Sequence, residues 1–195
     1  MDNQPDINTP ESQSPKRRPL LRFTVALLIT AIVATGLALV IDYLLFDNFY
    51  VNGYSMLPTL DGGDNDDKYD GDVILLNTVV TPKRGDIIVF FCDWSSEINP
   101  PDNLVKRVIG VAGDTVEIRS GDLYVNGQLQ QEDYIKEPMY NYSYPAVTVP
   151  EGHYYVLGDN RNNSKDSRDI GCVPAEKVIG VGWLIKTTDG KLHRL

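Results

Sequence analysis

The stretch NGYSMLPTL, residues 52–60, contains the first side chain that could carry out covalent chemistry. Ser55 is flanked by glycine, methionine and proline residues and would act as a nucleophile. A serine hydroxyl attacks a carbonyl carbon efficiently only when a neighbouring group accepts its proton. The proton acceptor is therefore the second residue to find.

Two histidines could complete a Ser-His-Asp arrangement, His153 and His193. His193 lies close to the last residue and His153 opens a strand among tyrosines, so both are interpreted as surface or strand-edge residues. A lysine is the other candidate, because burial can lower its pKa until a neutral amine accepts the proton. Lys106 lies in the apolar run NLVKRVIGV, where strand alternation places it on one face with Leu104 and Val108. The alternative is a lysine on an edge strand.

The residues after Asp47 form short runs rich in β-branched side chains, separated by turns. The predicted strands lie within residues 72–77, 86–92, 103–111, 114–120, 153–159 and 178–185. In LYVNGQL, Asn126 and Gly127 suit the two positive φ angles of a type I′ hairpin turn. No stretch after Asp47 has a helical period over three turns, so the expected fold class is mainly β.

Residues 23–41, FTVALLITAIVATGLALVI, carry no charge and nearly cross a hydrocarbon core of about 30 Å at 1.5 Å per residue. Residues 43–46 complete the span. The flanking charges are asymmetric, with Lys16, Arg17, Arg18 and Arg22 before the run and Asp42 and Asp47 after it. The positive-inside rule then places the N-terminus in the cytoplasm. A cleaved secretory signal is the competing interpretation.

The predicted organisation has three parts. Residues 1–19 form a polar, proline-rich cytoplasmic tail expected to be disordered, and residues 20–46 form a single transmembrane helix in the cell membrane. Residues 47–195 form an extracytoplasmic catalytic domain.

Charge and composition exclude several classes of function. The formal net charge of -9 makes nucleic acid an unsuitable partner. Cys92 and Cys172 are either two buried thiols or one bridge. The acidic stretch 61–72 fails the calcium-loop pattern, because aligning Gly71 puts Lys68 at a ligand position. It is interpreted as a solvated loop, and we expect no metal and no cofactor.

Four ordered blocks follow the apolar run: SMLPTL at 55–60, RGDIIVF at 84–90, VKRVIGVAGD at 105–114 and GDNRNNSKDSRDIG at 158–171. Together they resemble bacterial type I signal peptidases, also called leader peptidases, in the short single-span form. These are serine proteases with a Ser-Lys dyad. The resemblance extends from Phe49 to about Trp183. It implies an antiparallel, barrel-like β-domain with a small hairpin cap, here confined to residues 121–135 and their neighbours.

The resemblance also assigns roles to individual residues. Ser55 becomes the nucleophile, Lys106 the general base, and Ser164 the hydroxyl that holds the lysine amine. Supporting ion pairs are expected between Asp166 and Arg168 and between Asp159 and Arg107. Shallow substrate pockets would be lined by Phe49, Val51, Met56, Leu60, Leu104 and Val105.

Three positions depart from the family pattern. Gly53 replaces a serine that helps form the oxyanion hole in some members, so the backbone N–H of Ser55 is left as the main donor. Asn162 stands where aspartate is common, and Ala112 where proline is common. None of them removes an expected catalytic atom.

The resulting hypothesis is a membrane-anchored serine endopeptidase that removes signal peptides from exported precursors, cutting after alanine at one and three residues before the scissile bond. An extended chain from Phe46 holds Ser55 within about 30 Å of the membrane surface. The expected partners are signal peptides, the lipid bilayer and a nearby secretion translocon. Two alternatives stay open: a sortase-like transpeptidase with Cys172 as nucleophile and Arg168 nearby, and a catalytically silent, membrane-tethered binding module.

Overall fold

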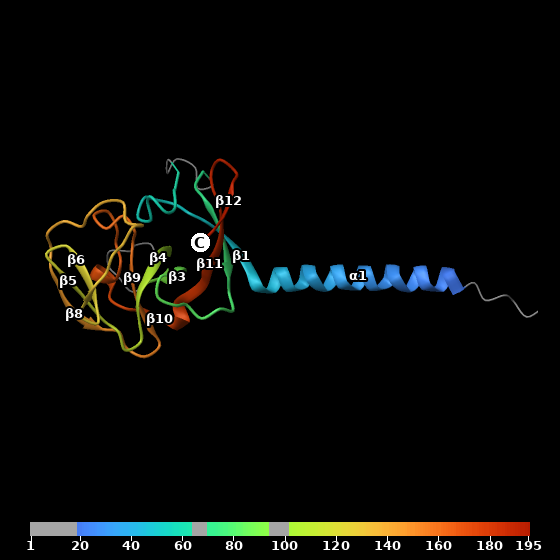
Figure 1. Cartoon of the computed structure of the whole chain (residues 1–195), viewed down its shortest axis with the longest axis horizontal. Coiled ribbons are helices and arrows are strands. Elements are labelled where there is room, and N and C mark those ends of the chain that lie inside the picture. Colours follow the sequence, from blue (N-terminus) through green and yellow to red (C-terminus); the bar gives the residue numbers. More distant parts are fainter. Residues whose placement is uncertain (1–18, 64–69, 94–101) are drawn as a thin grey trace, which may run out of the picture. The chain divides into compact units, whose positions relative to one another are not determined.

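A computed structural model describes residues 19–63, 70–93 and 102–195. The chain divides into two compact units, Met1–Asp42 and Tyr43–Leu195 (Figure 1). The predicted tail, apart from residue 19, and the middle of the acidic stretch 61–72 lie outside the described residues.

The N-terminal helix α1 covers Pro19–Leu45. Its window Arg22–Val40 has a mean hydropathy of 2.5, and none of that window is buried by the rest of the protein. A helix on the surface of a soluble domain has a polar face, whereas this helix is apolar on all sides. By length and composition it can cross a membrane, as predicted for residues 20–46.

The larger sheet of the second unit is antiparallel and has the strand order β1-β2-β11-β3-β4-β9-β10, with β12 added beside β11 (Figure 1). Its strands are β1 Phe46–Tyr50, β2 Val73–Asn77, β3 Ile87–Cys92, β4 Asp102–Val111, β9 His153–Leu157, β10 Val173–Pro174, β11 Val178–Lys186 and β12 Leu192–Arg194. Two short helices interrupt the strands in the chain: α2, Ser167–Ile170, lies between β9 and β10, and the 3₁₀ helix η1, Ala175–Lys177, lies between β10 and β11.

The smaller sheet is antiparallel and has the order β7-β6-β5-β8. Its strands are β5 Thr115–Arg119, β6 Asp122–Val125, β7 Gln128–Leu129 and β8 Tyr144–Thr148. The β6–β7 turn has φ angles of 53° at Asn126 and 75° at Gly127, which confirms the predicted hairpin.

Three apolar clusters hold these layers together. One cluster joins Val51 to Ile74 and Leu76 of β2 and to side chains of β3, β4 and β11. A second cluster is formed by other side chains of β3, β4, β9 and β11. The third joins Ile109 of β4 and Leu157 of β9 to the smaller sheet. The smaller sheet is therefore fixed directly on two adjacent strands of the larger one.

The mainly β prediction is confirmed, and each predicted strand is present. Four strands were not predicted. The start of β1 merges with the apolar membrane run, β8 contains a proline, and β10 and β12 are too short to show alternation.

Candidate active site

Ser55 and Lys106 meet although they are far apart in sequence. Lys106 Nζ lies 2.7 Å from Ser55 Oγ and donates a second hydrogen bond of 2.7 Å to the carbonyl oxygen of Val105. Ser55 lies in the irregular turn that follows β1, and Lys106 is in the middle of β4. Only 3% of Lys106 is exposed, so the lysine occupies an interior position of the strand, as the alternation predicted.

Burial changes the acid–base behaviour of this amine. Desolvation lowers the pKa of Lys106 to about 8, although the negative charges of Asp166 and Asp159 act in the opposite direction. A lysine with such a pKa is substantially neutral in mildly alkaline solution. It can then accept a proton from the serine hydroxyl with which it is in contact.

The loop after β9 holds the serine turn in place. The backbone N–H of Asn160 donates to the carbonyl oxygen of Ser55 over 3.0 Å, and its side-chain amide donates to the Tyr54 carbonyl over 2.9 Å. A Cβ atom on Gly158 would lie 2.5 Å from that same Ser55 oxygen, which is too close for any side chain. Glycine at position 158 therefore permits the loop to approach the nucleophile.

Two ion pairs brace this loop. Arg107 contacts Asp159 through Nε at 2.8 Å and through Nη2 at 2.6 Å, and Asp166 contacts Arg168 through two bonds of 2.8 Å. Both carboxylates are fully buried. Asp166 also accepts a hydrogen bond from the backbone of Gly158 and caps α2, so it connects both ends of the loop. The pairings are those that the family resemblance implied.

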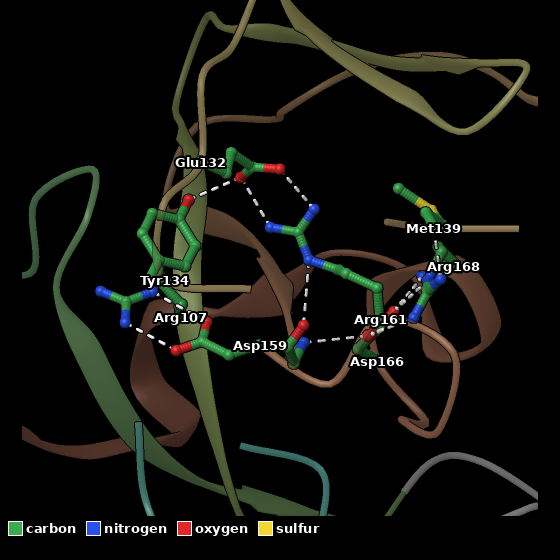
Figure 2. A network of polar contacts seen from close by, with 9 residues as sticks. Arg107, Glu132, Tyr134, Met139, Asp159, Arg161, Asp166 and Arg168 are labelled. Atoms are coloured by element: carbon green, nitrogen blue, oxygen red, sulfur yellow. Dashed lines mark hydrogen bonds and ion pairs between the residues drawn. The ribbon is translucent and has the colours of Figure 1, made fainter. Parts of the chain in front are cut away.

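A third buried ion pair was not predicted from the sequence. Arg161 lies in the loop after β9 and has no exposed side-chain surface. It binds Glu132, which follows the last strand of the β6–β7 hairpin, through two hydrogen bonds of 2.6 Å. Glu132 also accepts a hydrogen bond from Tyr134, whose ring lies 4.0 Å from the Arg107 guanidinium (Figure 2). In the sequence Glu132 belongs to the polar run QQED, where nothing distinguishes it from a surface residue.

The structure differs from the expectation for Ser164. Its Oγ atom is buried and has no hydrogen-bond partner among the described residues, so it does not hold the Lys106 amine. The amine's hydrogen bonds go to Ser55 and Val105. Ser164 Oγ instead faces Gly158, where any Cβ atom would lie 2.3 Å from it.

A cavity of about 550 Å³ opens beside the two reactive side chains. It is lined by Ser55 and Lys106 together with Phe49, Tyr50, Asn52, Asp102, Asn103, Leu104 and Val105. Three of the six expected pocket residues are thus present. Val51, Met56 and Leu60 are not part of the lining, because they are fully buried in the core cluster below. Met56 and Leu60 are one helical turn apart and share the inward face of the serine turn.

Strand β4 offers a free edge to this cavity. On one side it pairs with β3 from Asp102 to Arg107, whereas on the other side β9 pairs with it only from Arg107 onward. Within the described ranges 19–63, 70–93 and 102–195, no strand occupies the second edge of residues 102–106. An extended peptide could form main-chain hydrogen bonds there.

The surroundings of Ser55 also supply a backbone donor. Within the described part of the chain, the Ser55 N–H donates no hydrogen bond. Gly53, two residues earlier, has a φ of 82° and no side chain that could contribute a hydroxyl.

The alternative nucleophile is poorly placed for catalysis. Both cysteines are free thiols, so Cys92 and Cys172 do not form a bridge. Cys172 packs against the smaller-sheet core, and burial raises its pKa, which is the opposite of what a thiolate nucleophile requires. The histidines remain outside the site: His153 contacts the Glu151 carbonyl, and His193 lies in the exposed strand β12.

One member of the acidic stretch is not solvated as expected. Asp72 is buried and accepts hydrogen bonds from the backbones of Asp61 and Thr188 at 2.8 and 3.0 Å. It fixes the return of the stretch into β2. No cluster of metal-binding side chains occurs among the described residues.

Comparison with known proteins identifies the family. Residues 23–185 match the family model described as signal peptidase, peptidase S26. The probable signal peptidase I-1 of Synechocystis sp. is 38% identical over 87% of this chain and 84% of its own length. Signal peptidase I T of Bacillus subtilis is 32% identical over 95% of this chain and 94% of its own. A crystal structure of a signal peptidase I from Enterococcus faecalis aligns with a TM-score of 0.44 and 39% identity, covering 53% of this chain and 97% of that one. The chain therefore belongs to the signal peptidase family, peptidase S26, and is an enzyme of the signal peptidase I type.

Proposed function

We propose that this protein is a membrane-anchored serine endopeptidase that removes signal peptides from exported precursors, with Ser55 as nucleophile and Lys106 as general base. One observation carries the proposal. A buried lysine amine with a lowered pKa lies 2.7 Å from the hydroxyl of a serine that borders a cavity.

The reaction follows from this contact. Neutral Lys106 accepts the proton of Ser55 as Oγ forms a bond to the scissile carbonyl carbon. The Ser55 N–H stabilises the negative oxygen that develops. The lysine ammonium then gives its proton to the leaving amine as the C–N bond breaks, which leaves an acyl-enzyme. Lys106 next takes a proton from water as the water oxygen attacks the ester carbon, and it returns this proton to Ser55 Oγ as the ester C–O bond breaks.

The free edge of β4 supplies the substrate geometry. A precursor segment paired along residues 102–106 would alternate its side chains between the cavity and solvent. The residues one and three before the cut would then enter the cavity beside Phe49 and Leu104. The apolar part of the lining, formed by Phe49, Leu104 and Val105, accepts small side chains such as alanine and disfavours charged ones, which would lose water there without a partner.

Helix α1 supplies the location. It would hold the enzyme in the membrane, with the N-terminus in the cytoplasm and the catalytic unit outside, as the flanking charges indicate. Signal peptides carry their cleavage site just after an apolar segment, so the cut would be made beside the bilayer as the precursor leaves the translocon.

A serine-directed acylating probe tests the dyad. The full-length protein in detergent should be labelled once, whereas Ser55→Ala should not be labelled. Lys106→Arg should lose at least about 10³-fold in peptide cleavage, because a guanidinium keeps its proton. A matched Lys83→Arg variant, altered at an exposed lysine, should behave as the parent does.

The same experiment separates the alternatives. Labelling of Ser55→Ala that is abolished by Cys172→Ala would favour the transpeptidase. The absence of any labelling and any cleavage would favour the silent binding module. Near-normal cleavage by Lys106→Arg would refute the assigned base.

A further inference from the structure

The cavity beside Ser55 and Lys106 contains a second ionisable residue. Asp102 is the first residue of β4 and lines the cavity together with Leu104 and Lys106. Among the lining residues, Asp102 and Lys106 are the two with a formal charge. On the proposed function Lys106 is neutral when it accepts the serine proton, so Asp102 then provides the net charge of the lining.

Asp102 keeps its charge uncompensated within the described part of the chain. The residue is exposed, and its Oδ1 atom accepts a hydrogen bond of 2.7 Å from the backbone N–H of Asn103. No basic side chain forms an ion pair with it among the residues that the structure describes. Asp93 differs, because both of its carboxylate oxygens lie 3.1 Å from Lys177 Nζ.

The proposed pairing of the substrate determines which part of a precursor reaches Asp102. The scissile carbonyl must lie at Ser55 Oγ, which is in contact with Lys106. From Arg107 onward β9 occupies the edge of β4, so the segment before the cut can pair only from Lys106 towards Asp102. Asp102 is four residues from Lys106, or about 13 Å at 3.3 Å per residue. Substrate residues four to six before the cut therefore come close to it.

We infer, on the proposed function, that Asp102 makes the enzyme favour precursors with a basic side chain four to six residues before the cut. An arginine or lysine there can donate hydrogen bonds to the carboxylate, and its long side chain can reach across the strand edge. The two ends of the cavity then select different chemistry. Phe49, Leu104 and Val105 favour small apolar side chains near the cut, whereas Asp102 favours a cation farther from it.

The expected selectivity is modest because Asp102 is exposed. An exposed ion pair changes an equilibrium by roughly 1.4- to 5-fold at low ionic strength, and salt screens it. Changing a substrate residue from arginine to glutamate replaces an attraction by a repulsion. We therefore expect a difference of about 3- to 10-fold between such substrates.

Peptides that differ at one position provide the test. Arginine, glutamine or glutamate is placed in turn four, five or six residues before the cut, with alanine kept at one and three residues before it. The measurement is kcat/KM for the full-length protein in a non-ionic detergent at about pH 9, where most Lys106 is neutral and arginine keeps its charge. The arginine peptide should be cleaved fastest and the glutamate peptide slowest at one of these positions at least. The difference should shrink at about 0.5 M salt.

Two substitutions of Asp102 and a matched pair elsewhere complete the design. Asp102→Asn should bring the arginine and glutamate peptides close to equal rates, and Asp102→Lys should invert their order. Asp122→Asn and Asp122→Lys make the same changes in net charge at an exposed residue of β6 that does not line the cavity. Both should keep the order of the parent protein.

The outcomes separate this inference from the function on which it rests. Equal rates for the three peptides at every position would overturn the role of Asp102 and leave the peptidase activity intact. So would a preference for arginine that persists in Asp102→Asn, or an inversion that Asp122→Lys also produces. A parent protein that cleaves none of the peptides would overturn the proposed function and this inference with it.

Discussion

Lys106 reaches Ser55 from inside a sheet, and the groups around its amine act on it in opposite directions. Burial disfavours the ammonium form, whereas Asp166 and Asp159 favour it. Both carboxylates are already engaged by arginines, Arg168 and Arg107. This pairing reduces the negative potential that the carboxylates exert at the amine, so desolvation prevails and the pKa of Lys106 falls to about 8.

The pH dependence of cleavage follows from this value. Below pH 8 most Lys106 carries a proton and cannot act as a base, so kcat/KM should rise about tenfold per pH unit and then level off above the pKa. The measurement is cleavage of an uncharged peptide between about pH 6 and 10. A profile that is flat over this range would contradict the assignment of Lys106 as the base.

The same burial should cost stability. Below pH 8 Lys106 is protonated in the folded and the unfolded chain, and the folded chain bears an unfavourable charge worth up to about 3 kcal/mol. Between pH 8 and 10.5 the folded chain releases the proton while the unfolded chain keeps it, so stability rises with pH. Lys106→Met should therefore be inactive yet have a higher Tm than the parent at about pH 6, with the difference shrinking towards about pH 10.

Exposed Lys83→Met is the control, and its Tm should follow the parent at each pH. A Lys106→Met protein that is less stable than the parent in mildly acidic solution would show that the hydrogen bonds to Ser55 and Val105 outweigh the desolvation of the amine.

Among the elements, β4 has three roles: it carries Lys106, supports the smaller sheet through Ile109, and has one edge of residues 102–106 that no other described strand occupies. On the proposed function, this open edge governs specificity. Peptides with alanine at one and three residues before the cut should be cleaved about 10- to 200-fold faster than those with leucine at either position, and lysine should be worse still. The intervening residue should tolerate both, because it faces solvent.

This comparison requires kcat/KM for a matched set of peptides. Lysine accepted at the residue before the cut as well as alanine would refute the pairing of a substrate strand with β4.

The loop after β9 depends on an element distant in sequence, because Glu132 neutralises the buried guanidinium of Arg161. Glu132→Gln keeps the shape and removes the charge, so it should destabilise the fold by roughly 3 kcal/mol and lower kcat as the serine turn loosens. Glu117→Gln, in an exposed pair with Arg119, is the control and should leave Tm and kcat nearly unchanged. Equal effects of the two substitutions would show that the buried pair has no special role.

What could be predicted from the sequence depended on the range of the interaction. The burial of Lys106 follows from alternation within one strand, and the hairpin follows from the local preferences of Asn126 and Gly127. The Glu132–Arg161 pair and the buried Ser164 hydroxyl without a hydrogen-bond partner depend on how the loop after β9 packs against residues that are distant in sequence. The sequence pattern around each residue contains no information on that packing. Met56 and Leu60 were misplaced for a similar reason, since only the folded turn shows which face is inward.

The molecule as a whole consists of a helix that can cross a membrane and a β unit that has its own core. If the charges around α1 determine its orientation, protease added to intact spheroplasts should digest the unit after Asp47 and leave an N-terminal tag protected. Disrupted spheroplasts are the control, and both parts should be accessible in them. Digestion of the tag in intact spheroplasts would show that the orientation is the opposite one, in which the catalytic unit could not reach exported substrates.

The open edge of β4 has a consequence for the enzyme's output. If precursors pair with this edge as proposed, the released signal peptide keeps the segment that pairs with residues 102–106 and loses only the residues after the cut. It should therefore compete with the next precursor as a product inhibitor, and its apolar segment would keep it in the same membrane as the enzyme. Sustained secretion would then depend on how quickly cleaved signal peptides are destroyed, as well as on how quickly Ser55 reacts.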